Sequence, residues 1–381
     1  MKQIVHVLDK YAETGGVANY VIDCMDLLEK NGFENTVIYQ EHDEHTRRIK
    51  DSRNKVFAPD FHAFQSALQK QNPDIVFLHT IYDPNFIFYS ANNYFSVAYM
   101  HGFYPVCPGL AKYFRRTDVL CQQAFGWQCV VRIYLDRCAS AKRPDSVARI
   151  MRRTREYQRA YSSVGKFLVA NQYMKQLYVQ NGFPESKIMI LPPHFVYERP
   201  VDFLPKQAGQ LLYVGRLEIE KGIPYLLRML QKLPETFRLA VVGDGSMRTY
   251  YETMSAQMGI AQRVCFKGWL STKALEDEYK TAAILIMPSL TESFGKVGIE
   301  AMYWGTPVVA FSVGGIPEWL QNGRTGYLIP PLDVDAMAEC VKSLMADNSL
   351  RYEMGRNAIA YVNERFRAED HARRLIDVFE E

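Results

Sequence analysis

Long hydrophobic runs are missing from this sequence: no apolar stretch approaches the ~18–20 residues that a membrane-spanning helix needs. No basic and then apolar leader precedes the first predicted strand, so we expect no signal peptide and a cytoplasmic location. Seven cysteines, an odd number, argue against a disulfide framework. A formal net charge of +3 over 381 residues is too small to indicate a nucleic-acid partner.

The composition is ordinary for a globular protein, with 48% hydrophobic and 23% charged residues. The length exceeds that of a single core, so we expect two domains of roughly 150–200 residues. Short apolar segments typical of buried parallel strands alternate with helical segments in both halves. These segments are 3–8, 35–39, 74–78, 95–100, 166–170, 187–191, 211–216, 238–242, 264–270, 282–286 and 308–310. Prolines recur without periodicity across 192–209, the predicted linker. The pattern predicts an α/β fold with two Rossmann-like domains, 1–195 and 207–367.

The stretch 287–307 lies between two of the predicted strands and is the most informative part of the chain. Glu292 falls in the loop after the first strand, and a short helix is predicted to begin near Lys296 or Val297, with Glu300 in its first turn. Ligands of open α/β sheets bind beyond the carboxyl ends of the strands. A helix start favours a phosphate, and two carboxylates can accept hydrogen bonds from hydroxyl groups. A nucleotide sugar offers both kinds of group.

Other positions also suit a phosphate. Gly295 would let the backbone approach it closely. Arg216 and Lys221 are separated by four residues across a strand-to-helix loop, so both can face one crevice, although two exposed loop cations are the plainer interpretation. Gly15 and Gly16 follow the first strand and open a helix, which indicates either a phosphate-binding corner or a simple turn.

Three sequence patterns carry a resemblance to a known family. They are Pro288-Ser-x-x-Glu-x-Phe-Gly-x-x-x-x-Glu-Ala-Met, Gly305-Thr-Pro-Val-Val-Ala, and Gly215-Arg-Leu-x-x-x-Lys-Gly. They resemble the signature of the retaining GT-B glycosyltransferases of family 4. The resemblance implies a GT-B fold, in which an N-terminal acceptor-binding domain and a C-terminal nucleotide-sugar-binding domain face an interdomain cleft. It also implies that a C-terminal helix, about 368–381, packs back onto the N-terminal domain.

The resemblance assigns roles to individual residues. Arg216 and Lys221 would neutralise the donor diphosphate. Glu292 would hold a hydroxyl of the donor sugar, and Glu300 the ribose hydroxyls. His101, at the end of the strand 95–100, would contact the donor sugar and complete a catalytic set with Glu292, Arg216 and Lys221. The remaining positions that it places at the donor are Gly15, Gly16, Gly243, Gly245, Trp269, Leu270, Phe294, Gly295, Lys296 and Val297.

Two histidines, His79 and His101, end adjacent predicted strands. A histidine at a strand end can donate to a sugar hydroxyl or a phosphate, but a lone histidine is more often structural. The resemblance favours His101 as an active-site residue. Many family members follow this histidine with Asp, whereas Gly102 follows here, which puts a second contact in doubt. His79 ends the preceding strand and is the weaker candidate.

We expect neither a metal nor an organic cofactor. Asp333 and Asp335 have the Asp-x-Asp spacing of metal-dependent transferases, but they open a helix and are better explained by N-capping. Four cysteines cluster with 13, 7 and 8 intervening residues, which is not the close spacing of a structural zinc site. Separately buried thiols are the favoured interpretation of Cys107, Cys121, Cys129 and Cys138, while a metal or a disulfide there remains open.

Charge is distributed unevenly. Residues 111–160 hold twelve Lys or Arg against four Asp or Glu, a net charge of +8, which leaves about −5 for the rest of the chain (+3 − 8). Several of the arginines lie on one predicted helix with apolar residues between them. Such a segment suits an anionic membrane surface or an anionic lipid-linked acceptor, and a solvated basic face explains it equally well.

The resemblance implies a glycosyltransferase that acts with retention of configuration. It would move a sugar from a UDP- or GDP-linked donor to a hydroxyl of a carbohydrate or lipid-linked acceptor, without a metal. The implied setting is bacterial cell-surface polysaccharide, lipopolysaccharide or glycolipid synthesis, with peripheral attachment to the inner face of the cytoplasmic membrane. The alternatives are a sugar-nucleotide epimerase or phosphorylase on the same fold and a non-catalytic nucleotide-sugar-binding partner.

Overall fold

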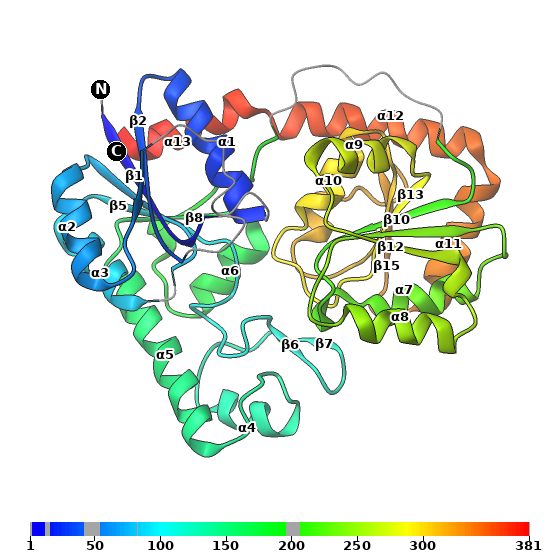
Figure 1. The fold of residues 1–381 in the computed structure, drawn as a ribbon, viewed down its shortest axis with the longest axis horizontal. Coiled ribbons are helices and arrows are strands. Elements are labelled where there is room, and N and C mark those ends of the chain that lie inside the picture. Colours follow the sequence, from blue (N-terminus) through cyan, green and yellow to red (C-terminus); the bar gives the residue numbers. More distant parts are fainter. Residues whose placement is uncertain (1, 12–15, 42–53, 82, 196–205, 381) are drawn as a thin grey trace. The chain divides into compact units, whose positions relative to one another are not determined.

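The computed structural model describes residues 2–11, 16–41, 54–81, 83–195 and 206–380. The chain divides into two compact units, each with one parallel sheet between helices (Figure 1). The first unit comprises 1–112, 122–196 and 366–381, and the second comprises 113–121 and 197–365. The predicted α/β class with two parallel-sheet domains is confirmed.

The first sheet has seven strands in the order β3-β2-β1-β4-β5-β8-β9, and all neighbours are parallel. Their bounds are β1 (Gln3–Lys10), β2 (Glu34–Glu41), β3 (Asn54–Phe57), β4 (Ile75–Leu78), β5 (Ser96–Tyr99), β8 (Lys166–Val169) and β9 (Ile188–Ile190). Strand β1 is central because it pairs with both β2 and β4, so that Ile4 lies opposite Asn35 and Ile75. Its burial on both faces explains its apolar sequence, which His6 alone interrupts between Ile4 and Leu8.

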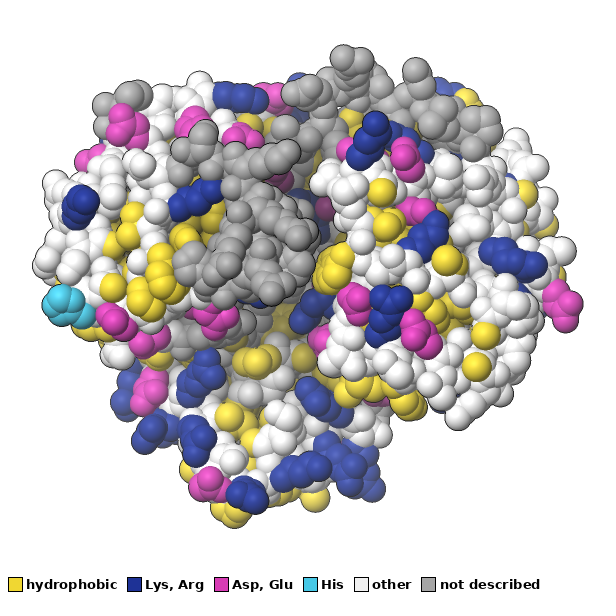
Figure 2. All heavy atoms as spheres, viewed as in Figure 1, with side chains coloured by type: hydrophobic (Ala, Val, Ile, Leu, Met, Phe, Trp, Pro, Cys, Tyr) yellow, Lys and Arg dark blue, Asp and Glu magenta, His cyan; other side chains and the backbone are white. Residues whose placement is uncertain are grey.

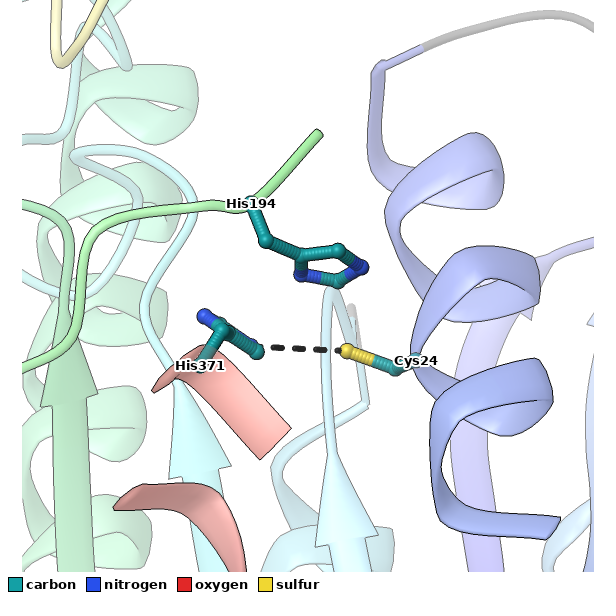
Figure 3. A group of neighbouring side chains, drawn as sticks. All are labelled: Cys24, His194 and His371. Atoms are coloured by element: carbon teal, nitrogen blue, oxygen red, sulfur yellow. Dashed lines mark hydrogen bonds between the residues drawn. The ribbon is translucent and has the colours of Figure 1, made fainter. Parts of the chain in front are cut away.

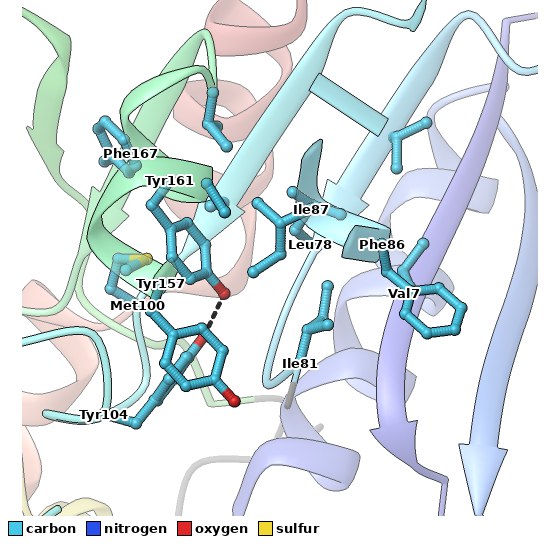
Figure 4. Packing of buried hydrophobic residues seen from close by; sticks show 14 of the residues in the cluster. Val7, Leu78, Ile81, Phe86, Ile87, Met100, Tyr104, Tyr157, Tyr161 and Phe167 are labelled. Carbon is cyan, nitrogen blue, oxygen red and sulfur yellow. Dashed lines mark hydrogen bonds between the residues drawn. The ribbon is translucent and has the colours of Figure 1, made fainter. Parts of the chain in front are cut away.

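Helices cover both faces of the first sheet. They are α1 (Gly16–Lys30), α2 (Phe61–Gln71), α3 (Pro84–Asn93), α5 (Pro144–Ser162), α6 (Gln172–Gln180) and α13 (Ala368–Glu380). Helix α4 (Gln128–Leu135) lies away from the sheet in Figure 1 and packs against α5. One hydrophobic cluster joins the sheet to α2, α3, α5 and α6, and a second cluster joins it to α1 and α13. Figure 4 shows the first cluster, where the phenols of Tyr104 and Tyr161 share a buried hydrogen bond. The C-terminal helix therefore packs within the first unit, against α1.

The second sheet has six parallel strands in the order β12-β11-β10-β13-β14-β15. Its strands are β10 (Gln210–Val214), β11 (Arg238–Val242), β12 (Val264–Gly268), β13 (Ile284–Met287), β14 (Val308–Phe311) and β15 (Gly326–Ile329). The helices of this unit are α7 (Ile223–Gln231), α8 (Arg248–Gln257), α9 (Thr272–Thr281), α10 (Lys296–Tyr303), α11 (Val334–Ala346) and α12 (Asn348–Arg365). In Figure 1, α9, α10 and α12 lie on one side of this sheet, and α7 and α8 lie on the other. The strand order reverses between β10 and β13, and this reversal is where open α/β sheets bind ligands.

A short antiparallel hairpin belongs to the second unit although its sequence interrupts the first. It consists of β6 (Tyr113–Phe114) and β7 (Val119–Leu120). The sequence patterns did not indicate this hairpin, β3 or β15, because these strands are short and have few consecutive apolar residues. Of the predicted linker 192–209, residues 196–205 lie outside the described residues. Within the described ranges, no helix is both long enough and apolar enough to cross a bilayer.

Candidate active site

The loops after β10 and β13 are pressed together at the point where the strand order reverses. After β10 the chain forms a 3-10 turn, Ile219–Lys221, and then enters α7 through Gly222, whose φ is +69°. A Cβ on Gly222 would lie 1.9 Å from the carbonyl oxygen of Pro288, so only glycine allows this approach. One backbone hydrogen bond, from Leu290 N to Glu220 O at 2.9 Å, joins the two loops directly.

This packing places Lys221 beside Glu292. Lys221 Nζ donates to Glu292 Oε2 at 2.7 Å, and the two side chains are only 17% and 13% exposed. The ammonium carries three N–H groups, so the ion pair leaves it capacity for further acceptors. Burial and the charges of Glu292 and Glu220 raise the pKa of the neighbouring Tyr213 phenol well above its usual value. The phenol therefore remains a neutral hydrogen-bond donor, and it donates to the Arg216 carbonyl at 3.1 Å.

The turn that follows β14 holds the backbone of Glu292 in place. Gly315 N donates to Glu292 O at 3.0 Å, and Gly314, with φ of +55°, approaches so closely that a Cβ would lie 1.9 Å from that same oxygen. The hydroxyl of Thr291 is buried and has no hydrogen-bond partner among the described residues. Sequence reasoning missed this buried hydroxyl beside Glu292, because Thr291 lies at a variable position of the motif.

Helix α10 begins where the sequence predicted. Gly295 precedes it with φ of +87°, and its first residue is Lys296. Glu300 is the fifth residue of α10 and so lies in its second turn, which corrects the first-turn prediction. Glu300 Oε2 accepts from Tyr279 OH at 2.9 Å, and Glu300 Oε1 lies 3.9 Å from Lys296 Nζ. One of its oxygens is therefore held by a buried phenol while the other lies near a cation.

The Trp319 side chain packs against α10 where the motif has Gly295 and Gly298. Its indole Nε1 donates to Phe294 O at 2.6 Å, and Phe294 itself is buried. A Cβ on Gly298 would lie 2.2 Å from the Trp319 ring, so the helix packs directly on the indole. Val297 follows Lys296 in the first turn, where its backbone N–H belongs to the unpaired helix start.

Arg216 is less constrained than Lys221. Its side chain is 63% exposed and lies 3.4 Å from Glu220 Oε1. The structure thus brings Arg216, Lys221 and Glu292 to two adjacent loops, with Glu300 on the helix that leaves the second loop. The carboxylate of Glu220, which the sequence patterns did not single out, holds the guanidinium near the loop.

The glycine corner after β11 is closely packed. A Cβ on Gly243, whose φ is +119°, would lie 2.1 Å from Gly215 O, and a Cβ on Gly245 would lie 2.6 Å from Leu217 O. Both glycines therefore serve the packing of this corner against the Arg216 loop. Trp269 follows β12 and is 55% exposed, and Leu270 beside it is half-buried.

The β6–β7 hairpin reaches the same side of the second sheet. Asp118 Oδ2 accepts a hydrogen bond from Tyr225 OH, on the first turn of α7, at 2.5 Å. Burial, with the charges of Glu220 and Asp118, raises the pKa of Tyr113 to about 12 against the opposing effect of Arg115. These contacts put the hairpin beside the Lys221 turn.

In the first unit, three histidines form a chain, in which His6 and His79 are buried and His101 is partly exposed. His6 Nε2 lies 3.0 Å from Asn35 Oδ1, His6 Nδ1 lies 3.2 Å from His79 Nε2, and His79 Nδ1 lies 3.3 Å from His101 Nε2. Asn35 Oδ1 can only accept, so each ring must carry its proton on Nε2 and accept on Nδ1. Burial lowers the pKa of His101 to about 3 and that of His79 well below its usual value, so both of these rings are neutral at pH 7.

This chain changes what His101 can do. We predicted that it donates to a ligand, but the tautomer leaves the lone pair on Nδ1, which therefore accepts hydrogen bonds. Sequence reasoning missed His6 and Asn35. A polar residue in the middle of an apolar strand was the available signal for His6. Of the predicted glycine pair, Gly15 lies outside the described residues, and Gly16 is the exposed first residue of α1.

The remaining predictions concern metals and thiols. Asp333 is the N-cap of α11, since its carboxylate accepts from Ala336 N at 2.9 Å. None of the seven cysteines, all of which lie in the described ranges, forms a disulfide. Among the described residues, the cysteines between 107 and 138 take part in no cluster with metal-binding geometry.

Two family profiles together match nearly the whole chain. The profile described as "Glycosyltransferase Family 4" matches residues 14–196, and the profile described as "Glycosyl transferases group 1" matches residues 198–361. The protein therefore belongs to the group 1 glycosyltransferases of family 4, and its fold is GT-B.

Individual relatives agree with this assignment. An uncharacterized glycosyltransferase, MJ1607 of Methanocaldococcus jannaschii, is 30% identical over 240 residues, which are 59% of this chain and 62% of that protein. Sucrose-phosphate synthase from Thermosynechococcus elongatus superposes with a TM-score of 0.77 at 20% identity, over 100% of this chain and 98% of that one. Anabaena HepE, in complex with UDP and glucose, superposes with a TM-score of 0.74 at 14% identity and 100% coverage of both chains. The matches cover less than two thirds of the length of the curated relatives.

Proposed function

We propose that the protein transfers a sugar from a nucleoside-diphosphate sugar to an acceptor hydroxyl, with retention of configuration. The observation that carries this proposal is the Lys221–Glu292 pair at the strand-order reversal, next to the start of α10. It combines a cation and a helix start, which suit a diphosphate, with a carboxylate that suits sugar hydroxyls. The HepE structure contains UDP and glucose, which makes UDP-sugars the first donors to test.

In the proposed reaction, positive charge develops at the anomeric carbon while negative charge develops on the leaving diphosphate. Arg216, Lys221 and the start of α10 would stabilise the diphosphate, and fixed electrostatics of this kind is usually the largest catalytic contribution. Glu292 would orient the sugar through a hydroxyl group. His101 Nδ1 would accept a hydrogen bond from a sugar hydroxyl. Attack from the face of the departing diphosphate would let that group accept the acceptor proton and would retain configuration.

Donor identity and stereochemistry can be tested in sequence. A panel of UDP-, GDP- and ADP-sugars should give one donor that raises the thermal midpoint, because a ligand of the folded state stabilises it. With that donor and a hydroxyl acceptor, NMR of the first product should show the anomeric configuration of the donor. An inverted product would contradict retention. Acceptor-independent conversion of the donor sugar would favour the epimerase alternative, and binding without any product would favour a non-catalytic partner.

A membrane-associated acceptor is supported by helix α4 and its surroundings. Only Ile133 of α4 is buried, while its exposed apolar side chains recur at helical spacing. These are Trp127, just before the helix, at 75% exposure, Val130, Val131, Tyr134 and Leu135. Exposed arginines of α5 lie nearby, and Figure 2 shows Lys and Arg side chains gathered over this part of the first unit. Aromatic and aliphatic groups framed by cations suit an anionic membrane surface.

We therefore propose that residues 111–160 hold the protein on the inner face of the cytoplasmic membrane, where it would meet a lipid-linked acceptor. Vesicles that contain anionic lipid should sediment the wild-type protein, and Trp127→Ser should reduce the bound fraction several-fold. Trp269→Ser, which removes an exposed tryptophan of the second unit, is the matched control. Equal binding to neutral and anionic vesicles would contradict the electrostatic part of the proposal.

A further inference from the structure

A cysteine and two histidines meet in the core of the first unit. Cys24 lies on α1, His194 lies four residues after β9, and His371 lies on α13 (Figure 3). One ligand atom from each side chain lies within 4.8 Å of the others, and all three residues are buried. Three segments far apart in the sequence thus contribute one nitrogen or sulfur atom each to a single point.

His371 is already oriented for coordination. Its Nδ1 donates to the carbonyl oxygen of Pro192 at 2.8 Å, so its Nε2 carries the lone pair. This backbone hydrogen bond fixes the tautomer in the way that is usual for metal-binding histidines. Two atoms lie close to His371 Nε2: Cys24 Sγ at 3.8 Å and Tyr20 OH at 3.1 Å.

The Tyr20 phenol also hydrogen-bonds with Cys24, so the phenol, the thiol and the His371 imidazole form one buried polar group. A cation bound there would accept lone pairs from sulfur and nitrogen at once. Zinc binds sulfur at about 2.3 Å and imidazole nitrogen at about 2.0–2.1 Å, which puts tetrahedral ligand atoms roughly 3.5 Å apart. The separation of 3.8 Å between Cys24 Sγ and His371 Nε2 is close to this value, and the His194 ring would have to move slightly inward from its position within 4.8 Å.

The donor set selects the kind of ion. One thiolate and two imidazoles suit zinc and neighbouring transition metals, whereas Mg²⁺ and Ca²⁺ prefer oxygen ligands. We propose that Cys24, His194 and His371 bind a structural zinc-class divalent ion, with Tyr20 or solvent as the fourth ligand. The ion would fasten the C-terminal helix α13 and the segment before residue 196 to α1. This proposal is independent of the proposed transfer reaction, because its ligands are not donor-site residues.

Metal content and cobalt spectroscopy of the full-length protein test the proposal directly. Wild-type protein purified with zinc should retain about one equivalent, and a strong chelator should lower its thermal midpoint. Replacement by Co²⁺ should give a thiolate-to-cobalt charge-transfer band. Cys24→Ser should abolish that band and weaken metal retention at least about tenfold. Cys265→Ser, which changes an exposed cysteine on β12, should leave both unchanged.

Two outcomes would overturn the proposal. One is a wild-type protein that retains no zinc above background and shows no thermal shift on zinc addition. This measurement uses the wild-type protein alone, so it does not depend on whether a variant folds. The other is a Cys24→Ser protein that keeps the charge-transfer band, since the ion would then be bound by another cysteine.

Discussion

At the scale of single residues, we expect the Lys221–Glu292 pair to contribute both to sugar transfer and to the stability of the fold. Lys221→Met should slow sugar transfer by about 10²–10³-fold, because the leaving diphosphate loses a preorganised cation. It should also destabilise the fold by about 1–3 kcal/mol, since the Glu292 carboxylate is left largely buried without its partner. Initial transfer rates and urea unfolding measure the two effects.

Lys232→Met is the matched control for this change. Lys232 follows α7 and pairs with Asp335 on an exposed part of the same unit, where its side chain is 46% exposed. Exposed ion pairs contribute little, so this variant should keep wild-type rates and stability within about 1 kcal/mol. Equal rates in Lys221→Met and wild-type protein would remove Lys221 from the proposed site.

At the scale of elements, the turn after β14 determines where Glu292 lies. Gly314→Ala should weaken donor stabilisation and slow transfer, because its Cβ would meet Glu292 O at 1.9 Å and the loop would have to shift. Gly323→Ala is the control: its φ is +76°, but nothing lies within 4 Å of the added Cβ. The free energy of unfolding of Gly323→Ala should therefore fall only by the backbone strain of about 1–2 kcal/mol, and its activity should be retained. Similar losses of activity in both variants would contradict a specific effect on the Glu292 loop.

The β6–β7 hairpin offers a second test at this scale. Asp118 and Tyr225 are linked by a charge-assisted hydrogen bond, and such bonds are worth about 1.5–3 kcal/mol. Asp118→Ala and Tyr225→Phe should each destabilise the second unit, and the double variant should cost clearly less than the sum of the two. Hydrogen exchange of the α7 amides would measure these changes. Strict additivity would show that the hairpin does not dock through this pair.

At the scale of the whole molecule, the histidine chain makes stability depend on pH. The unfolded chain protonates His101 near pH 6.5, whereas burial lowers its folded pKa to about 3. The unfolded state therefore binds more protons between these values, and stability falls as the pH drops from 6.5 toward 3. The loss by pH 4 should be about 2 kcal/mol, less than the full shift would give because the ring is not wholly shielded from solvent.

Hydrogen exchange of the β1 and β4 amides at pH 7 and pH 4.5 would measure this loss in the first unit. His101→Gln should show a smaller difference between the two pH values than wild type. His62→Gln, which changes an exposed histidine of α2, should keep the wild-type difference. A pH dependence that is unchanged in His101→Gln would mean that His101 does not carry it.

Much of this architecture could be predicted from the sequence because buried parallel strands are short continuous apolar runs, and helix starts carry recognisable glycines and caps. Glu292 and Lys221 could be singled out because both lie in the loops that follow such strands. The histidine chain was not, because His6, His79 and Asn35 become neighbours only through the strand order β2-β1-β4. The Cys24, His194 and His371 cluster was hidden for the same reason, since its members are separated by more than a hundred residues. Short strands such as β6 and β7 depend on tertiary contacts rather than on their own sequence.

The excursion of 113–121 into the second unit has a practical consequence for domain exchange. A chimera that joins the C-terminal half of this protein to the N-terminal half of a relative would leave Tyr225 facing a foreign hairpin. Exchanging the second unit between two such proteins would thus require two separate pieces of chain to be transplanted together.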